Sequence, residues 1–160
     1  MPSNFATADW ETEIKGILGT DEVKSAVQGI DLDMVMQVGP TPDIGLESNL
    51  NLLMSIHGGD VVQKVISQAD ADAQQYVFGY DYATMKGMMK GTVQMQAAFM
   101  QGKVKLVKGD MSSLMTLAPK MAGLTSINTK IADATVWPDE LSGGDLDAYK
   151  KALADKLAAA

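Results

Sequence analysis

The stretch that decides the fold is residues 70–121, DADAQQYVFGYDYATMKGMMKGTVQMQAAFMQGKVKLVKGDMSSLMTLAPKM. Two segments within it, residues 76–80 and 103–108, alternate their side chains with the period of a β-strand. Between and after these segments, apolar residues recur with the spacing of one helix face. A strand followed by helices and a second strand predicts a crossover connection, which lays helices against one face of a sheet.

Two helical stretches are expected between these strands. Asp81 is suited to cap the first helix, and Gly91 is suited to end it. Residues 93–100 make a further helical turn or two, which closes at Gly102. The connection between the two strands is therefore predicted to be helical.

The second strand is expected at the edge of the sheet. Residues 103–108, KVKLVK, alternate strictly and carry three lysines, which discourage pairing with a further strand. A helix is predicted to begin near Met111 behind an Asp110 cap, and Pro119 kinks or shortens it.

Working outward towards the N-terminus, the pattern predicts two helices and three strands. The first helix lies between a cap at Thr7 or Asp9 and an end at Gly19. The DADA motif at residues 70–73 is interpreted as a break that follows the third strand. The other expected elements are a helix over 21–28, a strand over 32–38, and hairpin arms over 50–56 and 61–68 joined by Gly58-Gly59-Asp60.

Towards the C-terminus, residues 125–144 are interpreted as irregular. Residues 145–159 are predicted to form an amphipathic helix that packs on the domain and covers an opening. We expect residues 1–124 to fold without this extension. The apolar face of the helix is formed by Leu146, Tyr149, Leu153 and Leu157.

Together these elements predict the α+β fold class, with a single five-stranded, mostly antiparallel sheet and helices covering one face. The chain has 160 residues, of which 46% are apolar, so residues 1–160 suit one domain with a substantial core.

Composition excludes several classes of function. The net charge is −7, and all 13 basic residues are lysines. Arginine is the usual bidentate reader of phosphate and guanine, so its absence argues against a nucleic-acid partner. The lack of cysteine removes thiolate nucleophiles, disulfides and cysteine-based metal sites. The N-terminus shows no signal peptide and the apolar runs are too short to span a bilayer, so a cytoplasmic location is expected.

An ordered set of short features within residues 70–121 resembles one known family. The features are an aspartate-led strand (Asp72, Tyr76 to Tyr80), a helix ending at Gly91, the pairs Ala98-Phe99 and Gly102-Lys103, a strand ending at Gly109-Asp110, and a leucine- and methionine-rich helix (Leu114 to Met121). This set resembles the sterol carrier protein type-2 domain family. The resemblance covers residues 10–124 as a family-like core, and residues 125–160 depart from it.

The resemblance implies an apolar tunnel between the sheet and its helices. It implies non-catalytic binding and transfer of a lipid, whether a sterol, a fatty acid, an acyl-thioester or a phospholipid. It implies no catalytic residues, and we expect no cofactor and no metal. The protein is therefore expected not to be an enzyme.

Eight of the twelve methionines lie within residues 85–121. Methionine is flexible and fills irregular gaps, so these residues suit either a plain core or the adaptable wall of a lipid pocket. Met115 is expected on the inward face of its helix. With the family resemblance, the predicted lipid-binding residues are Met85, Met88, Met89, Met95, Phe99, Met100, Leu106, Met111, Leu114, Met115 and Met121.

Other features have simpler interpretations. His57, the only histidine, lies beside a glycine turn and is expected to be exposed rather than catalytic. The paired aspartates of residues 31–33 and 70–72 lack calcium-loop spacing, so no metal site is predicted. The lysines of 103–108 suit a solvated edge, or transient contact with anionic headgroups of a membrane. The alternative function is an accessory or scaffold interaction module with a solid methionine-rich core.

Overall fold

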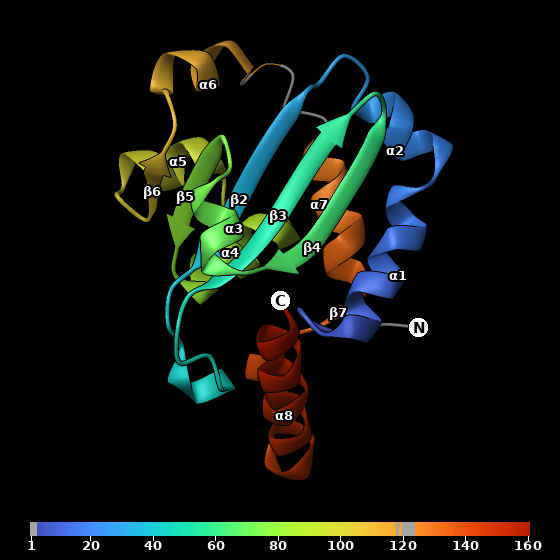
Figure 1. Cartoon of the computed structure of the whole chain (residues 1–160), viewed down its shortest axis with the longest axis vertical. Helices are drawn as coiled ribbons and strands as arrows, with labels where there is room; N and C mark the ends of the chain where they lie inside the picture. The colour runs from blue at the N-terminus through green and yellow to red at the C-terminus, as the bar shows by residue number, and fades with distance from the viewer. Residues whose placement is uncertain (1–2, 118, 120–123) are drawn as a thin grey trace.

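The structure, a computed structural model, describes residues 3–117, 119 and 124–160 (Figure 1). Its main sheet has five strands in the order β4-β3-β2-β5-β6. Strands β2 and β5 pair in parallel, whereas the other neighbouring strands pair antiparallel. The predicted fold class, α+β with a mostly antiparallel sheet, is therefore confirmed. The strands are β2 (Leu32–Val38), β3 (Leu50–His57), β4 (Asp60–Ile66), β5 (Tyr76–Tyr80) and β6 (Val104–Lys108).

The register of the strands builds one continuous apolar face. Met36 of the central strand β2 lies between Leu52 of β3 and Phe78 of β5. Phe78 in turn pairs with Leu106 of β6. Because side chains alternate along a strand, these neighbours all point to the same side, the inner face of the sheet. The opposite, outer face carries a smaller apolar cluster around Val35 and Val77.

Most helices contribute buried side chains to the core on the inner face. Thr7 caps α1, where its hydroxyl accepts a hydrogen bond from the backbone N–H of Trp10 at 3.4 Å. Asp81 caps α4 as predicted, by accepting from the backbone N–H of Thr84 at 2.7 Å, and Thr7 is one of the two caps predicted for α1. The predicted helices are α1 (Ala8–Leu18), α2 (Asp21–Ala26), α4 (Tyr82–Lys90), α5 (Met95–Met100), α6 (Met111–Leu117) and α8 (Gly143–Ala159).

Two helices contradict the sequence interpretation. The DADA motif does not merely break the chain but lies in α3 (Gln68–Asp72), because Ser67 accepts a hydrogen bond from the Asp70 N–H at 3.2 Å and caps a helix there. Strand β4 accordingly ends at Ile66 rather than at residue 68. The first part of 125–144 is not irregular but forms α7 (Leu124–Asp133), which packs against α4 and α1.

The two ends of the chain meet at the N-terminal side of α1. A short parallel pair joins β1 (Ser3–Asn4) to β7 (Thr135–Val136). Trp10 donates its ring N–H to the Thr135 hydroxyl at 2.9 Å, and both residues are buried. Two short 3-10 turns, η1 (Pro42–Ile44) and η3 (Pro138–Glu140), complete the described elements.

Residues beyond 124 take part in the hydrophobic core. Trp137, Tyr149 and Leu153 are each at most 3% exposed, and Phe5 packs against Trp137 with ring centroids 5.2 Å apart. The Tyr149 hydroxyl also donates to the Phe5 carbonyl at 2.9 Å. This burial argues against an independent fold of residues 1–124.

Helix α8 is tied to the β4 side of the sheet. Lys156 of α8 forms an ion pair with Glu11 of α1 at 2.5 Å, and Glu11 also accepts from the backbone N–H of Val65 at 2.6 Å. Figure 1 shows α8 and α6 at opposite ends of the long axis of the molecule. Helix α8 therefore lies far from α6.

Candidate functional site

The apolar inner face approaches solvent at its β6 end. Phe78 of β5 is fully buried, whereas its neighbour Leu106 is only partly buried. Phe99 of α5 meets Phe78 edge to face, with ring centroids 6.2 Å apart, and is also partly buried. The core surface thus continues without a polar break from the centre of the sheet to its β6 edge.

The predicted site residues divide by exposure. Met85 and Met89 of α4 are fully buried members of the core. Met88, Phe99 and Leu106 pack on that core but remain partly exposed. Three more are exposed, namely Met100, Met111 and Met115, with exposed fractions of 85%, 44% and 68%.

Three of the predicted residues have no described side-chain position. The backbone of Met95 lies in α5 and that of Leu114 lies in α6. Met121 lies outside the described residues.

The expectation that Met115 faces inward is wrong. Helix α6 starts where Asp110 accepts hydrogen bonds from the Ser112 N–H at 3.1 Å and the Ser113 hydroxyl at 3.0 Å, as predicted for its cap. The helix then stands away from the sheet (Figure 1), and its Met111 and Met115 side chains meet solvent instead of the core. Sequence spacing identifies which residues share a helix face, but it does not say whether anything covers that face.

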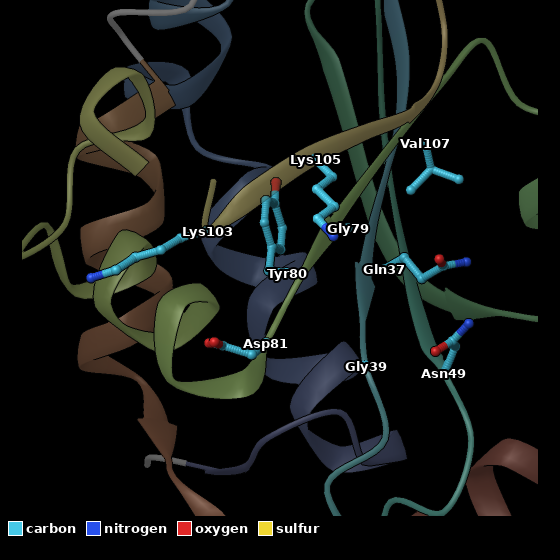
Figure 2. A pocket seen from close by; sticks show the side chains of 9 residues that line it. All are labelled: Gln37, Gly39, Asn49, Gly79, Tyr80, Asp81, Lys103, Lys105 and Val107. Atoms are coloured by element: carbon cyan, nitrogen blue, oxygen red, sulfur yellow. The ribbon is translucent and has the colours of Figure 1, made fainter. Parts of the chain in front are cut away.

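A pocket of about 260 Å³ lies on the outer face of the sheet over Gly79. Figure 2 shows Lys105 and Gln37 on either side of Gly79, with Lys103 pointing away from Gln37. The missing side chain of Gly79 keeps this space open, because a Cβ there would come within 3.2 Å of Val107 Cγ2. This pocket lies across the sheet from the buried methionines and is lined by no residue of the predicted lipid site.

A second pocket, of about 440 Å³, lies beside α4 and η3. Lys86 forms an ion pair with Asp139 at 2.9 Å, and the Tyr82 hydroxyl donates to the same carboxylate at 2.5 Å. Partial burial opposes ionisation of Asp139, but these hydrogen bonds hold its pKa below the usual value. The group fixes the η3 turn to α4 and includes no residue of the predicted lipid site.

His57 has partners that the sequence interpretation missed. Its ring nitrogens contact Asp31 and, at 2.9 Å, Asp33, while the Ser55 hydroxyl donates to Asp33 at 2.6 Å. The hydrogen bonds to Asp33 and Asp31 raise the pKa of His57. The register of β2 and β3 sets Asp33 opposite Ser55. The histidine side chain is half-exposed, and no residue of this group lines either of the two pockets.

Gln63 is a buried polar residue on the inner face. It lies on β4 opposite Met54 and is only 5% exposed. Neither its amide nitrogen nor its amide oxygen has a hydrogen-bond partner among the described residues. Nor do the described residues contain a cluster of acidic or histidine side chains suited to a metal ion.

Comparison with known protein families identifies one that matches this chain. The model of the SCP-2 sterol transfer family matches residues 27–121, more than half of the chain. The chain belongs to this family. The family is one of lipid-binding and lipid-transfer proteins, and the predicted resemblance is confirmed.

The matched region contains every strand of the main sheet and helices α3 to α6. Helices α1, α2, α7 and α8 lie outside it, although all four supply buried core residues. The SCP-2 region of this protein is therefore packed against elements that the family match does not include.

Solved structures show the same fold. A possible sterol carrier protein from Thermus thermophilus has a TM-score of 0.65 at 18% identity, covering 81% of this chain and 93% of its own. A crystal structure of sterol carrier protein 2 has a TM-score of 0.64 at 20% identity, covering 81% and 97%. The sterol carrier protein domain 2 of Helicoverpa armigera has a TM-score of 0.53 at 16% identity, covering 81% and 95%.

Among curated proteins no significant match was found. No helix in the described part of the chain has the length and apolar character needed to cross a membrane.

Proposed function

We propose that this protein binds and transfers lipids without catalysing a reaction, holding the apolar part of the ligand between the inner face of the sheet and helices α4 to α6. The observation that carries the proposal is the continuous apolar surface from Phe78 to Leu106 and Phe99, which reaches solvent beside exposed methionines. Exposed apolar surface in a folded domain commonly marks a binding site. Membership of the SCP-2 family supports the choice of a lipid as ligand.

The proposed residues suit a ligand of variable shape. Buried Met85 and Met89 form the floor, partly buried Met88, Phe99 and Leu106 form the wall, and α6 brings Met111 and Met115 to the entrance. Methionine adapts its rotamers to irregular partners, so one such wall accommodates sterols, acyl chains or phospholipid tails. Met95, Met100, Leu114 and Met121 complete the proposed set.

The binding energy of such a ligand comes from burial alone. Each buried methylene contributes about 0.8 kcal/mol, so a long acyl chain gains roughly 10 kcal/mol before the costs of association and ordering. Affinities near micromolar, on the order of −8 kcal/mol, remain after those costs. No charged side chain is required to hold the apolar part.

A scaffold module with a solid methionine core is the second candidate. The full burial of Met85 and Met89 favours it, as does the absence of methionine from the lining of the two pockets described above. The two candidates differ in whether lipid accompanies the protein. Native mass spectrometry of the purified chain separates them, because only the lipid carrier retains a bound lipid mass.

A matched pair of variants on β6 tests the proposed wall. Leu106 faces the inner side and is partly buried, whereas the adjacent Val107 faces outward and is 59% exposed. Leu106→Gln is expected to weaken binding of a fluorescent fatty-acid probe to delipidated protein at least about tenfold, because it puts an amide against the apolar ligand. Val107→Gln is expected to leave the probe affinity unchanged.

Denaturant midpoints at constant slope establish that both variants are folded. Equal loss of affinity in both variants, or no probe binding by the unmodified protein, would reject this site and leave the scaffold module ahead.

A further inference from the structure

Charge is distributed very unevenly along this acidic chain. Residues 76–117, from β5 to α6, contain five lysines and two acidic residues, Asp81 and Asp110. The rest of the chain contains eight lysines and eighteen acidic residues. A net charge of −7 thus divides into a segment of +3 and a remainder of −10.

The positive segment is also where apolar side chains are exposed. The described residues include five exposed large apolar side chains, and four of them belong to this segment. They are Met100, Val107, Met111 and Met115, whereas Val62 alone lies on β4. Figure 1 shows α5, β6 and α6 together on one side of the molecule, away from α1 and α8.

Two lysines of this region are available for an external partner. Lys103 and Lys105 are exposed, and the ammonium group of neither has a hydrogen bond or ion pair within the described part of the chain. Lys108 instead donates to the backbone carbonyl of Asp72 at 2.5 Å. The six exposed residues Met100, Lys103, Lys105, Val107, Met111 and Met115 are called the β6 edge below.

We propose that the β6 edge is the surface by which this protein docks on anionic membranes. The inference rests on the proposed function, since it names the surface at which a carried lipid is exchanged. Lysines near an anionic bilayer are attracted to its headgroups, and flexible thioethers next to them enter the boundary between headgroups and acyl chains. The aliphatic stems of the lysines cover apolar surface while their ammonium groups stay at headgroup level.

The charge on the rest of the molecule makes the docking directional. A remainder of −10 is repelled by an anionic surface, so the protein approaches with the β6 edge foremost. In that orientation the partly buried Phe99 and Leu106, which belong to the proposed lipid site, lie close to the bilayer. Lipid then passes between membrane and protein without crossing bulk water.

The test is sedimentation of the full chain with vesicles of phosphatidylcholine, with and without added phosphatidylserine. The double variant Lys103→Glu/Lys105→Glu is expected to bind the anionic vesicles at least about 30-fold more weakly. The matched control is Lys64→Glu/Lys151→Glu. Lys64 is exposed on β4, the other edge strand, and Lys151 is exposed on α8, so the control makes the same charge change away from the β6 edge.

The control is expected to lose less than about threefold, because distant charges are screened by salt. Equal losses in the two double variants, or equal binding of the unmodified protein to neutral and anionic vesicles, would overturn the proposal. Preference for an acidic protein over anionic vesicles would likewise assign the β6 edge to another partner.

A separate measurement keeps this proposal distinct from lipid binding itself. The fatty-acid probe is titrated into each double variant in solution without vesicles, where Lys103 and Lys105 play no part. Unchanged probe affinity with lost vesicle binding supports the docking surface.

Met115→Gln is expected to weaken vesicle binding several-fold, since it replaces a thioether with an amide at the bilayer boundary. Full vesicle binding by this variant contradicts the insertion of α6.

Discussion

The two edge strands of the sheet, β4 and β6, differ in how far other elements cover them. At the β4 edge, α1 packs along the strand and Glu11 connects Val65 to Lys156 of α8. At the β6 edge, Leu106 is half-covered and Val107, Met111 and Met115 are exposed. The β4 side gathers the aromatic residues of both chain ends, whereas the β6 side carries flexible thioethers and unpaired lysines.

This contrast separates stability from access. Aromatic rings and ion pairs that link distant parts of the chain resist local opening. Elements with few buried contacts, such as α6, open at lower free energy and are the usual place for ligand entry. We infer that the β4 side holds the fold together and that the β6 side exchanges ligand.

The largest effect is expected from removing residues 125–160. This deletion takes away Ile127, Ile131, Trp137, Tyr149 and Leu153, each at most 3% exposed. Truncating one such residue typically costs about 2–5 kcal/mol, so the sum exceeds the usual stability of about 5–15 kcal/mol. We expect no cooperative thermal transition in the truncated chain by circular dichroism.

Deletion of residues 158–160 is the control, because these alanines are exposed. A cooperative, native-like transition in residues 1–124 would show that the β4 side does not depend on the C-terminal elements.

A smaller effect is expected from single truncations on the two sides. Leu153→Ala removes a fully buried side chain near β4 and should cost about 2–5 kcal/mol of unfolding free energy. Met100→Ala removes a side chain that is 85% exposed and should change stability by less than about 0.5 kcal/mol. Denaturant unfolding measures both values. Similar losses of unfolding free energy in the two variants would contradict the proposed difference between the two edges.

A gain in stability of about 1 kcal/mol is expected from Gln63→Leu. The amide of Gln63 is buried beside β4 without a partner in the described residues, so it loses its hydration without compensation. Leucine of similar size removes that cost. Lys64→Leu, at the next and exposed position, is the control and should be nearly neutral. A loss of stability in Gln63→Leu would indicate that water or ligand satisfies the amide.

The smallest effect concerns pH. Asp33 and Asp31 raise the pKa of His57 above its ordinary value of 6.5. A raised pKa means that the folded state holds the proton more tightly, so the added stability is complete below about 6.5 and is lost as pH rises through the folded pKa. We expect His57→Gln to flatten the dependence of stability on pH in that window.

The pKa of His57 is measured directly by its ring proton shifts. A measured pKa at or below 6.5 would show that Asp31 and Asp33 do not stabilise the protonated form of His57. Asp33, whose pKa is lowered mainly by Ser55, should lose its contribution only as pH falls through the acidic range.

Local patterns predicted most of the fold. The five strands, the caps at Thr7, Asp81 and Asp110, and the left-handed glycine at Gly91 all depend on residues within a few positions of one another. Helix α7 was missed although Leu124, Ile127 and Ile131 recur at helical spacing. Its serine, threonine and asparagine residues are weak helix formers, so packing against α4 and α1 stabilises it.

The sequence suggested which residues belong to the candidate site, but it did not predict which of them are exposed to solvent. Spacing placed Met85 and Met89 together on one face of a helix, and both are buried. The same kind of spacing placed Met115 on an inward face, yet it is 68% exposed. The difference depends on whether another element covers that face, which no local pattern contains.

The sequence by itself determined the period of each element, its caps and turns, the family and the separation of charge, because these are properties of neighbouring residues or of simple counts. The tertiary structure alone decided which apolar faces are covered. Burial arises only where two elements meet, so Trp137 and Tyr149 became core residues while the methionines of α6 remained at the surface.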